Sequence, residues 1–337
     1  MLDKLAFVLL FACLMLCIGI LKHNNVLNPV YSLLQSKIKN KRVLMAVLSS
    51  VFGILPVPGR VTLATGCFDT CTKVHKHRGD LGILAYLSTH HYYLWSPLEK
   101  SVLLVLGGLG LTYPEFVIIM LPYIATLLVC TWYYIFFVMK DIDNVVIQFE
   151  PEMCWKKFTD TTILVASIIL ACCDILPIHY IYASVLLYLI CRYKPTVKQL
   201  VTYLDYKMLL FTTIVISLSY HVHKHIDTIH NILGGLSGNY GAHVALLFSF
   251  CASFLLGSSS KFSGIVVLLV PIYGIATLPV FYIVDFCGYL LSPMHKCVLI
   301  SNRYFKTKYV AFYKIVGIIC LILTTLTIIN YYMKITL

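Results

Sequence analysis

Residues 116–139 read FVIIMLPYIATLLVCTWYYIFFVM, and they contain no charged side chain. A helix needs about 20 apolar residues to cross the roughly 30 Å hydrocarbon core of a bilayer, so this stretch is long enough to span it. Three other uncharged stretches have a similar length, namely Leu5–Leu21, Phe262–Val284 and Ile315–Met333. Together these segments predict an integral membrane protein that crosses the bilayer several times.

The overall composition supports the same prediction. The chain has 337 residues, of which 60% are hydrophobic and 12% charged, and its mean hydropathy is +0.87. Soluble domains are about 45–50% apolar and about 25% charged. The net charge of +12 lies in short loops between apolar runs, as expected for a membrane protein and not for a nucleic-acid-binding arm. We therefore expect a multi-pass protein of the cell membrane, in particular of a prokaryotic inner membrane, with the lipid bilayer and not nucleic acid as partner.

Two features that could suggest a secreted protein have simpler explanations. Leu5–Leu21 resembles a signal peptide, but Cys17, Ile18 and Ile20 stand where small cleavage-site residues are needed, so we expect a retained helix. Most of the 13 cysteines lie inside apolar runs, where a thiol behaves as a small hydrophobe. Cys67 and Cys71 have regular spacing, but two thiols alone make a poor zinc site. No disulfide framework, metal or other cofactor is predicted.

A charged segment, Lys140–Lys157, divides the chain. It has no apolar run long enough to span, and it is expected to connect two membrane regions outside the bilayer. The predicted organisation is a first membrane half at 1–139, a connecting loop at 140–157 and a second membrane half at 158–337. The predicted fold class is all-α and polytopic, with about nine to eleven membrane segments.

Three apolar runs are interrupted by helix-breaking residues. The interruptions are Pro56-Val57-Pro58-Gly59, Gly257-Ser258-Ser259-Ser260-Lys261 and Leu291-Ser292-Pro293. Broken backbone at membrane depth is stable only where protein or a water-filled cavity covers it. Breaks in both halves of a chain are typical of a transporter whose binding site lies near the bilayer midplane.

The residues at the first two breaks suit an anion, although each break has an alternative explanation. Serine hydroxyls and the start of the helix after Gly257 could bind an anionic group, or this segment could be an ordinary surface loop. Arg60 could bind such a group with two hydrogen bonds, or it could extend to the headgroups from an interfacial turn. The predicted substrate-binding residues are Pro56, Pro58, Gly59, Arg60, Thr62, Gly257, Ser258, Ser259, Ser260, Lys261, Ser292 and Pro293.

Asp285 and His295 are the predicted residues for ion or proton coupling. Asp285 lies inside an apolar run, where acidic residues are rare and usually functional. His295 follows the Pro293 break and could carry a proton, or it could simply end a helix. Two other histidine-bearing stretches are assigned to the membrane surface: Ser88–Pro97 as an aromatic belt, and the segment containing His221 and His225 as a wet interfacial helix.

At these breaks the sequence resembles an uncharacterised prokaryotic integral membrane protein family that is grouped with the ion-transporter superfamily of secondary carriers. The resemblance rests on GILPVPG at 53–59, His91–Pro97, LLGSS at 255–259, and GYLLSPMHKC at 288–297. It implies two inverted halves, re-entrant hairpins, broken helices and a homodimer. Arg60, Lys261 and Lys296 depart from the family pattern by adding charge at or beside the breaks.

The function predicted from these features is secondary active transport of a small anionic organic solute, coupled to protons or sodium. Because the sequence holds no HExxH, GxSxG or phosphate-binding glycine motif, an enzyme is not expected. An alternative is a non-transporting membrane scaffold or partner-binding subunit derived from a carrier, which the added charges favour. A third hypothesis is a metal- or haem-binding redox membrane protein that uses the histidines.

Overall fold

The computed structural model describes an all-helical chain. It covers residues 2–24, 26, 33–34, 36–51, 61, 64, 68, 78–97, 99–139, 155–173, 176–204, 206–225, 228, 241–257 and 259–336. The predicted break at Pro56–Gly59, together with Arg60 and Thr62, lies outside these residues, and so do residues 140–154 of the predicted connecting segment 140–157. Cys67, Cys71 and Ser258 also lie outside them.

The described helices follow the apolar runs of the sequence. In the first part of the chain they are α1 (Leu2–His23), α3 (Lys41–Val51), α5 (Arg78–Ser88), the 3-10 turn η1 (His91–Leu94), α6 (Lys100–Leu109), α7 (Tyr113–Tyr133) and the π turn η2 (Tyr134–Val138). In the second part they are α8 (Trp155–Cys172), α9 (Ile178–Tyr193), α10 (Val197–Tyr203), α11 (Tyr206–Lys224), α13 (Gly241–Leu256), α14 (Ser259–Tyr273), η5 (Ile275–Thr277), α15 (Leu278–Leu291), α16 (Lys296–Phe305) and α17 (Tyr309–Thr336).

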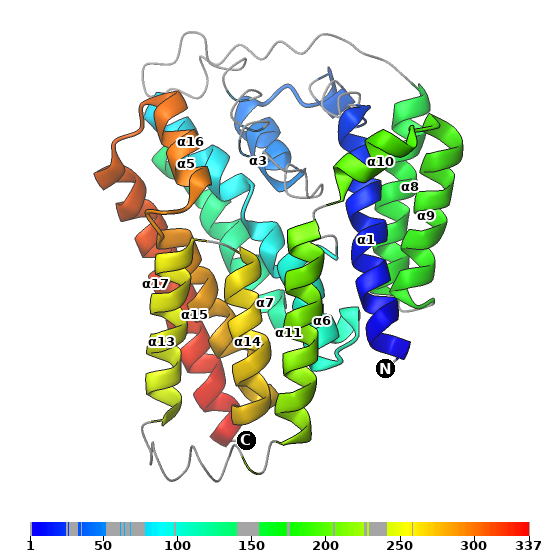
Figure 1. Ribbon diagram of the computed structural model, residues 1–337. Coiled ribbons are helices and arrows are strands. Elements are labelled where there is room, and N and C mark those ends of the chain that lie inside the picture. Colours follow the sequence, from blue (N-terminus) through cyan, green and yellow to red (C-terminus); the bar gives the residue numbers. More distant parts are fainter. Residues whose placement is uncertain are drawn as a thin grey trace.

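Most of the long helices run roughly parallel to one another in two neighbouring groups (Figure 1). In one group, α15 packs against α13, α14 and α17, and α11 packs against α14. In the other group, α9 packs against α1 and α8. Helix α6 joins the groups by contacting α1, α11 and α14. The two chain ends lie at one end of the bundle, whereas α3, α5 and α16 lie at the other (Figure 1).

Helix α7 shows how the sequence sets the ends of a long apolar helix. It begins with a capping box, in which the Glu115 carboxylate accepts hydrogen bonds from the backbone N–H and the hydroxyl of Thr112, each at 2.8 Å. At the other end the Arg42 guanidinium donates to the carbonyl oxygens of Ile135 and Phe136, at 3.1 and 2.6 Å. A helix end leaves its last carbonyls unpaired, so Arg42 supplies the donors that the π turn needs.

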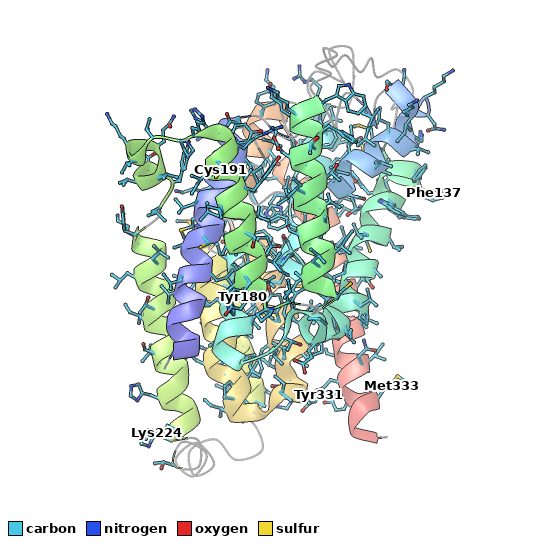
Figure 2. The ribbon with its side chains drawn as sticks, turned by 90° about the vertical axis from the view of Figure 1, so that its right-hand side faces the viewer. Phe137, Tyr180, Cys191, Lys224, Tyr331 and Met333 are labelled. Atoms are coloured by element: carbon cyan, nitrogen blue, oxygen red, sulfur yellow. The ribbon has the colours of Figure 1, made fainter. Side chains whose placement is uncertain are left out.

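Several helices have the length and surface that a bilayer requires. Two are long and apolar enough to cross a membrane, Tyr113–Val138 and Tyr309–Met333, and the bent pair Ile275–Leu291 and Lys296–Phe305 makes a third if it counts as one span. Large apolar side chains point outward over these helices, among them Phe137 and Met333 (Figure 2). Phe137 is 76% exposed and Val310 is 83% exposed. Water would not favour so many exposed apolar side chains, whereas lipid would.

Two of the predicted segments are corrected by the structure. The run Phe262–Val284 is not one span, because α14 ends at Tyr273 and the chain turns at Gly274, whose φ is +90°, before η5 and α15. Ser88–Pro97 is not an aromatic belt at the membrane surface. Its rings lie in the core, and His91 and Tyr92 are each only 1% exposed. In the first case the apolar run continues across the turn, and in the second tyrosine and histidine suit a hydrogen-bonded core as well as an interface.

Candidate functional site

The predicted break after Leu291 is a sharp bend between α15 and α16. The axes of the two helices differ by 41°. Within the bend, the Ser292 hydroxyl oxygen accepts a hydrogen bond from the backbone N–H of Met294, and the Ser292 carbonyl accepts one from the N–H of His295, both at 3.2 Å. Ser292 and His295 are buried, whereas Pro293 and Met294 are exposed. Only one side of this break therefore faces the protein interior.

The break at Gly257 lies directly against the break at Ser292. Gly257 ends α13 with a φ of +55°, and its N–H donates to the Ser253 carbonyl at 3.0 Å. A Cβ atom at this position would lie 2.9 Å from the Ser292 hydroxyl oxygen and 3.0 Å from the backbone nitrogen of His295. Glycine is thus required both for its backbone conformation and for the close approach. Two of the three predicted breaks meet at one place.

Next to the breaks, α13 and α15 enclose a buried acidic group. The Asp285 side chain is 0% exposed, and one of its carboxylate oxygens accepts a hydrogen bond from the Ser249 hydroxyl. The Ser253 hydroxyl also lies near this carboxyl group, but Ser253 Oγ and Asp285 Oδ2 form no regular hydrogen bond with the described residues. The helices approach closely here, because a Cβ on Gly288 would lie 2.7 Å from the Phe250 carbonyl oxygen. The result is a carboxyl group and two hydroxyls held in an apolar interior.

A second buried polar cluster joins the α15–α16 bend to α5 and η1. The Tyr86 hydroxyl donates to the Leu290 carbonyl at 2.8 Å and lies 3.0 Å from His295 Nδ1. His90 Nε2 lies 3.3 Å from His295 Nε2. The Tyr93 and Tyr289 hydroxyls are hydrogen-bonded at 2.8 Å. Hydrogen bonds between segments this far apart in sequence fix the position of the bend.

The structure describes some of the predicted site residues and not others. Gly257, Ser292, Asp285 and His295 are described, and Asp285 lies seven residues before Ser292, or about two helical turns. Asp285 and His295 therefore belong to neighbouring clusters and not to one. The backbone of Ser259–Lys261 forms the first turn of α14, but the side chains there are not described. The remaining predicted residues, Pro56, Pro58, Gly59, Arg60, Thr62 and Ser258, lie outside the described residues.

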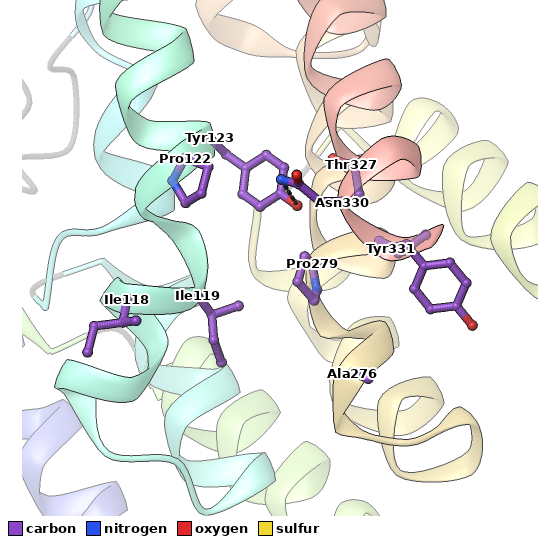
Figure 3. A pocket seen from close by; sticks show the side chains of 10 residues that line it. Ile118, Ile119, Pro122, Tyr123, Ala276, Pro279, Thr327, Asn330 and Tyr331 are labelled. Atoms are coloured by element: carbon purple, nitrogen blue, oxygen red, sulfur yellow. Dashed lines mark hydrogen bonds between the residues drawn. The ribbon is translucent and has the colours of Figure 1, made fainter. Parts of the chain in front are cut away.

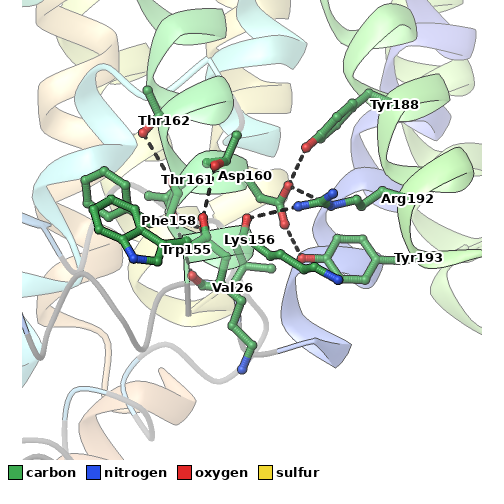
Figure 4. A network of polar contacts seen from close by, with 12 residues as sticks. Val26, Trp155, Lys156, Phe158, Asp160, Thr161, Thr162, Tyr188, Arg192 and Tyr193 are labelled. Carbon is green, nitrogen blue, oxygen red and sulfur yellow. Dashed lines mark hydrogen bonds and ion pairs between the residues drawn. The ribbon is translucent and has the colours of Figure 1, made fainter. Parts of the chain in front are cut away.

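The sequence analysis missed a buried acid at Asp160. Its carboxylate accepts hydrogen bonds from the Tyr188 hydroxyl at 2.6 Å and from the Tyr193 hydroxyl, and Arg192 Nε lies 3.5 Å away (Figure 4). These contacts connect α8 to α9. Because both carboxylate oxygens have partners, Asp160 is explained as a structural link between the two helices. The sequence did contain a signal for this residue, because an acidic side chain near the start of an apolar helix is rare.

A pocket of about 250 Å³ does not include the breaks at Gly257 and Ser292 among its lining residues (Figure 3). It is lined by residues of α7, η5, the start of α15 and the end of α17, namely Ile118, Ile119, Pro122, Tyr123, Ala276, Pro279, Val280, Thr327, Asn330 and Tyr331. Its main polar contact is a 3.5 Å hydrogen bond from Asn330 to the Tyr123 hydroxyl. None of the predicted substrate-binding residues lines this pocket, so the pocket gives no support to their assignment as a binding site.

These observations define a class of protein: all-helical, with helices of membrane length, a helix pair broken near its end, and buried polar groups beside the break. The chain belongs to a family of proteins of unknown function, DUF401, whose family model matches residues 6–334. No curated protein matches the chain. The match confirms membership of an uncharacterised family, while its grouping with the ion-transporter superfamily stays a prediction. A function must therefore be argued from the site itself.

Proposed function

We propose that the protein is a multi-pass protein of the cell membrane that transports a small anionic organic solute, coupled to protons or sodium ions. The observation that carries this proposal is the buried Asp285 carboxyl group beside two helix breaks that touch each other. Buried acids inside apolar helices are costly to a structure and are found mainly where ions or protons move.

The surroundings of Asp285 suit an exchangeable cation. A carboxylate without a nearby positive charge is very unfavourable in an apolar interior, so Asp285 must hold a proton or bind a cation there. The Ser249 and Ser253 hydroxyls offer two further oxygen atoms beside the carboxyl group. Oxygen ligands suit hard cations such as sodium. Release of the proton or cation would leave an unstable charge, which favours a conformational change.

The break at Gly257 provides the complementary site for an anion. Helix α14 begins at Ser259, directly after this break. The first turn of a helix has unpaired N–H groups and a partial positive charge, and both attract a carboxylate. Ser259, Ser260 and Lys261 stand in this turn. The solute would therefore bind near Ser292, which is about two helical turns from the coupling group.

The proposal also covers the number of membrane segments and their arrangement. The bent pair α15–α16 is either a broken span or a re-entrant loop, and further apolar helices, including Ile178–Tyr193 and Gly241–Leu256, are shorter than a full span. With these shorter helices included, we propose the about nine to eleven membrane segments expected from the sequence. We include two inverted halves, re-entrant hairpins and a homodimer in the proposed arrangement.

Binding of the solute can be tested without transport. A panel of small carboxylates is expected to raise the unfolding temperature of the detergent-purified protein, because a ligand at 100 times its Kd adds about 2.7 kcal/mol to the free energy of unfolding. The increase should be lost in Ser292→Ala. It should persist in the control Ser184→Ala, whose exposed hydroxyl bonds only its own helix at the Tyr180 carbonyl. An equal ligand effect in both variants would place the binding site elsewhere.

One observation favours the alternative of a non-transporting membrane scaffold. The two breaks pack so closely that a methyl group at Gly257 would touch Ser292, and no residue of these breaks lines the pocket beside Tyr123. Close packing between the two described breaks would serve a scaffold without any solute. The two functions are distinguished by flux, because a scaffold would show no gradient-dependent uptake of any solute in a broad panel.

A further inference from the structure

Three side chains of metal-ligand type meet at the buried end of α15. The ligand atoms of His90, His295 and Cys297 all lie within 4.8 Å of one another. His90 is 1% exposed and His295 is 2% exposed, while Cys297 is partly buried. His90 and His295 are separated by 205 positions in the sequence, so only the fold brings them together.

The hydrogen bonds of His90 determine which ring nitrogen carries the proton. His90 Nδ1 lies 2.6 Å from the Tyr86 carbonyl oxygen, which can only accept. Its other neighbour, the Thr89 hydroxyl at 3.2 Å, gives its own proton to the Ala85 carbonyl at 2.8 Å. Nδ1 must therefore be the donor. In a neutral ring the proton on Nδ1 leaves Nε2 with a lone pair.

His295 has the same arrangement. Its Nδ1 lies 3.3 Å from the Tyr289 carbonyl oxygen and 3.0 Å from the Tyr86 hydroxyl. The Tyr86 hydroxyl has one proton, and its shorter contact, at 2.8 Å, is to the Leu290 carbonyl, which can only accept. His295 Nδ1 is thus the donor to both neighbours, and His295 Nε2 has a lone pair.

The two Nε2 atoms therefore face each other with lone pairs at 3.3 Å. Two lone pairs repel unless a cation lies between them. A proton shared between the two nitrogens would make one ring cationic, and a charged ring is costly at side chains that are only 1–2% exposed. Two nitrogen ligands of a tetrahedral metal ion, each about 2.0–2.1 Å from it, stand about 3.3–3.4 Å apart. The 3.3 Å between the Nε2 atoms of His90 and His295 matches the separation expected for two nitrogen ligands of one metal ion.

We infer that His90, His295 and Cys297 bind a zinc-like transition metal ion. Imidazole and thiolate ligands select zinc and copper over magnesium or calcium. Cys297 lies in the first turn of α16, where the helix dipole favours a negatively charged ligand. The carbonyls of Tyr86 and Tyr289 accept from the Nδ1 atoms and so orient both rings, as the partners of metal-bound histidines commonly do. Three ligands leave a fourth position open.

This proposed site goes beyond the proposed transport activity and differs from the expectation of no metal drawn from the sequence. His90 belongs to the predicted first half of the chain, and His295 and Cys297 belong to the second. A bound ion would join the end of α5 to the α15–α16 bend, next to Gly257. We therefore expect it to stabilise the bend whether or not the protein transports a solute.

The test uses the full-length protein purified in detergent, stripped with chelator and titrated with Zn²⁺ or Co²⁺. The wild type is expected to bind about one ion per chain, and its Co²⁺ form should show a thiolate-to-cobalt charge-transfer band. Cys297→Ser should remove that band and weaken binding by about 10-fold or more. His90→Gln and His295→Gln should also weaken binding. The controls Cys251→Ser and His243→Ala change exposed residues of α13 and should bind as the wild type does.

The outcomes separate the inference from its alternatives. A wild-type protein that binds neither ion, or that binds Co²⁺ without the charge-transfer band, would overturn it and favour a histidine pair sharing a proton. Equal loss of binding in Cys251→Ser would show that the metal interacts with surface thiols. Because the band is measured on the wild type, the test remains decisive even if a histidine variant does not fold. Metal binding is read out without solute, so its result is independent of transport.

Discussion

Replacement of Asp285 by asparagine is expected to reduce strongly the solute accumulation driven by an ion gradient, while exchange of solute across the bilayer persists. The amide fills the same space as the carboxyl group and can still accept the hydrogen bond from Ser249. It cannot release a proton, and it binds a cation far more weakly. Coupling free energies are typically about 1–3 kcal/mol, so we expect gradient-driven accumulation to fall by about 5- to 150-fold.

The measurement is uptake of labelled solute into proteoliposomes with and without an imposed proton or sodium gradient. Glu115→Gln is the matched control, since it removes the same charge from an exposed acid that caps α7. It should retain coupled uptake. If Asp285→Asn accumulated solute as the wild type does, Asp285 would be a structural residue and the coupling group would have to be sought elsewhere.

Replacement of Gly257 by alanine is expected to destabilise the fold more than the same change at Gly110. Both glycines have positive φ, at +55° and +69°, so alanine costs about 1–2 kcal/mol at either position. Nothing lies within 4 Å of a Cβ at Gly110. At Gly257 the Cβ would meet Ser292 and the backbone of residues 294 and 295 at about 3 Å, and such overpacking adds about 1–3 kcal/mol.

The comparison requires the free energy of unfolding of both variants in the same detergent. A larger loss in Gly257→Ala than in Gly110→Ala would show that the two breaks pack against each other. Equal losses would show that they do not touch in the folded protein. Because α14 begins two residues after Gly257, the first variant should also weaken any ligand that binds to the start of that helix.

Local signals in the sequence predicted part of the fold and of the site. Long uncharged runs located α7 and α17, because helix length and hydrocarbon thickness are directly related. Gly257 and Pro293 located two breaks, because glycine and proline act on the backbone at their own positions. By contrast, the break at Gly274 was missed, since the apolar run continues on both sides of it and glycine is also common inside membrane helices.

Contacts between distant segments could not be predicted in this way. The close approach of His90 to His295 depends on how α5, η1 and the α15–α16 bend are packed, and nothing in the spacing of either histidine indicates it. The same holds for Ser249 and Asp285, which come from different helices. The assignment of Ser88–Pro97 to a surface belt failed for a related reason. Tyrosine and histidine suit both an interface and a hydrogen-bonded core, and only tertiary contacts distinguish the two.

The central claim is that the protein moves a small anionic solute by using an ion gradient. The most direct test is to reconstitute the purified wild type in proteoliposomes and measure accumulation of labelled small carboxylates against their own gradient. We predict that at least one carboxylate accumulates when a proton or sodium gradient is imposed, and that an ionophore which collapses this gradient stops the accumulation. Absence of gradient-dependent flux for every solute in a broad panel, with correctly folded protein in the vesicles, would contradict the account.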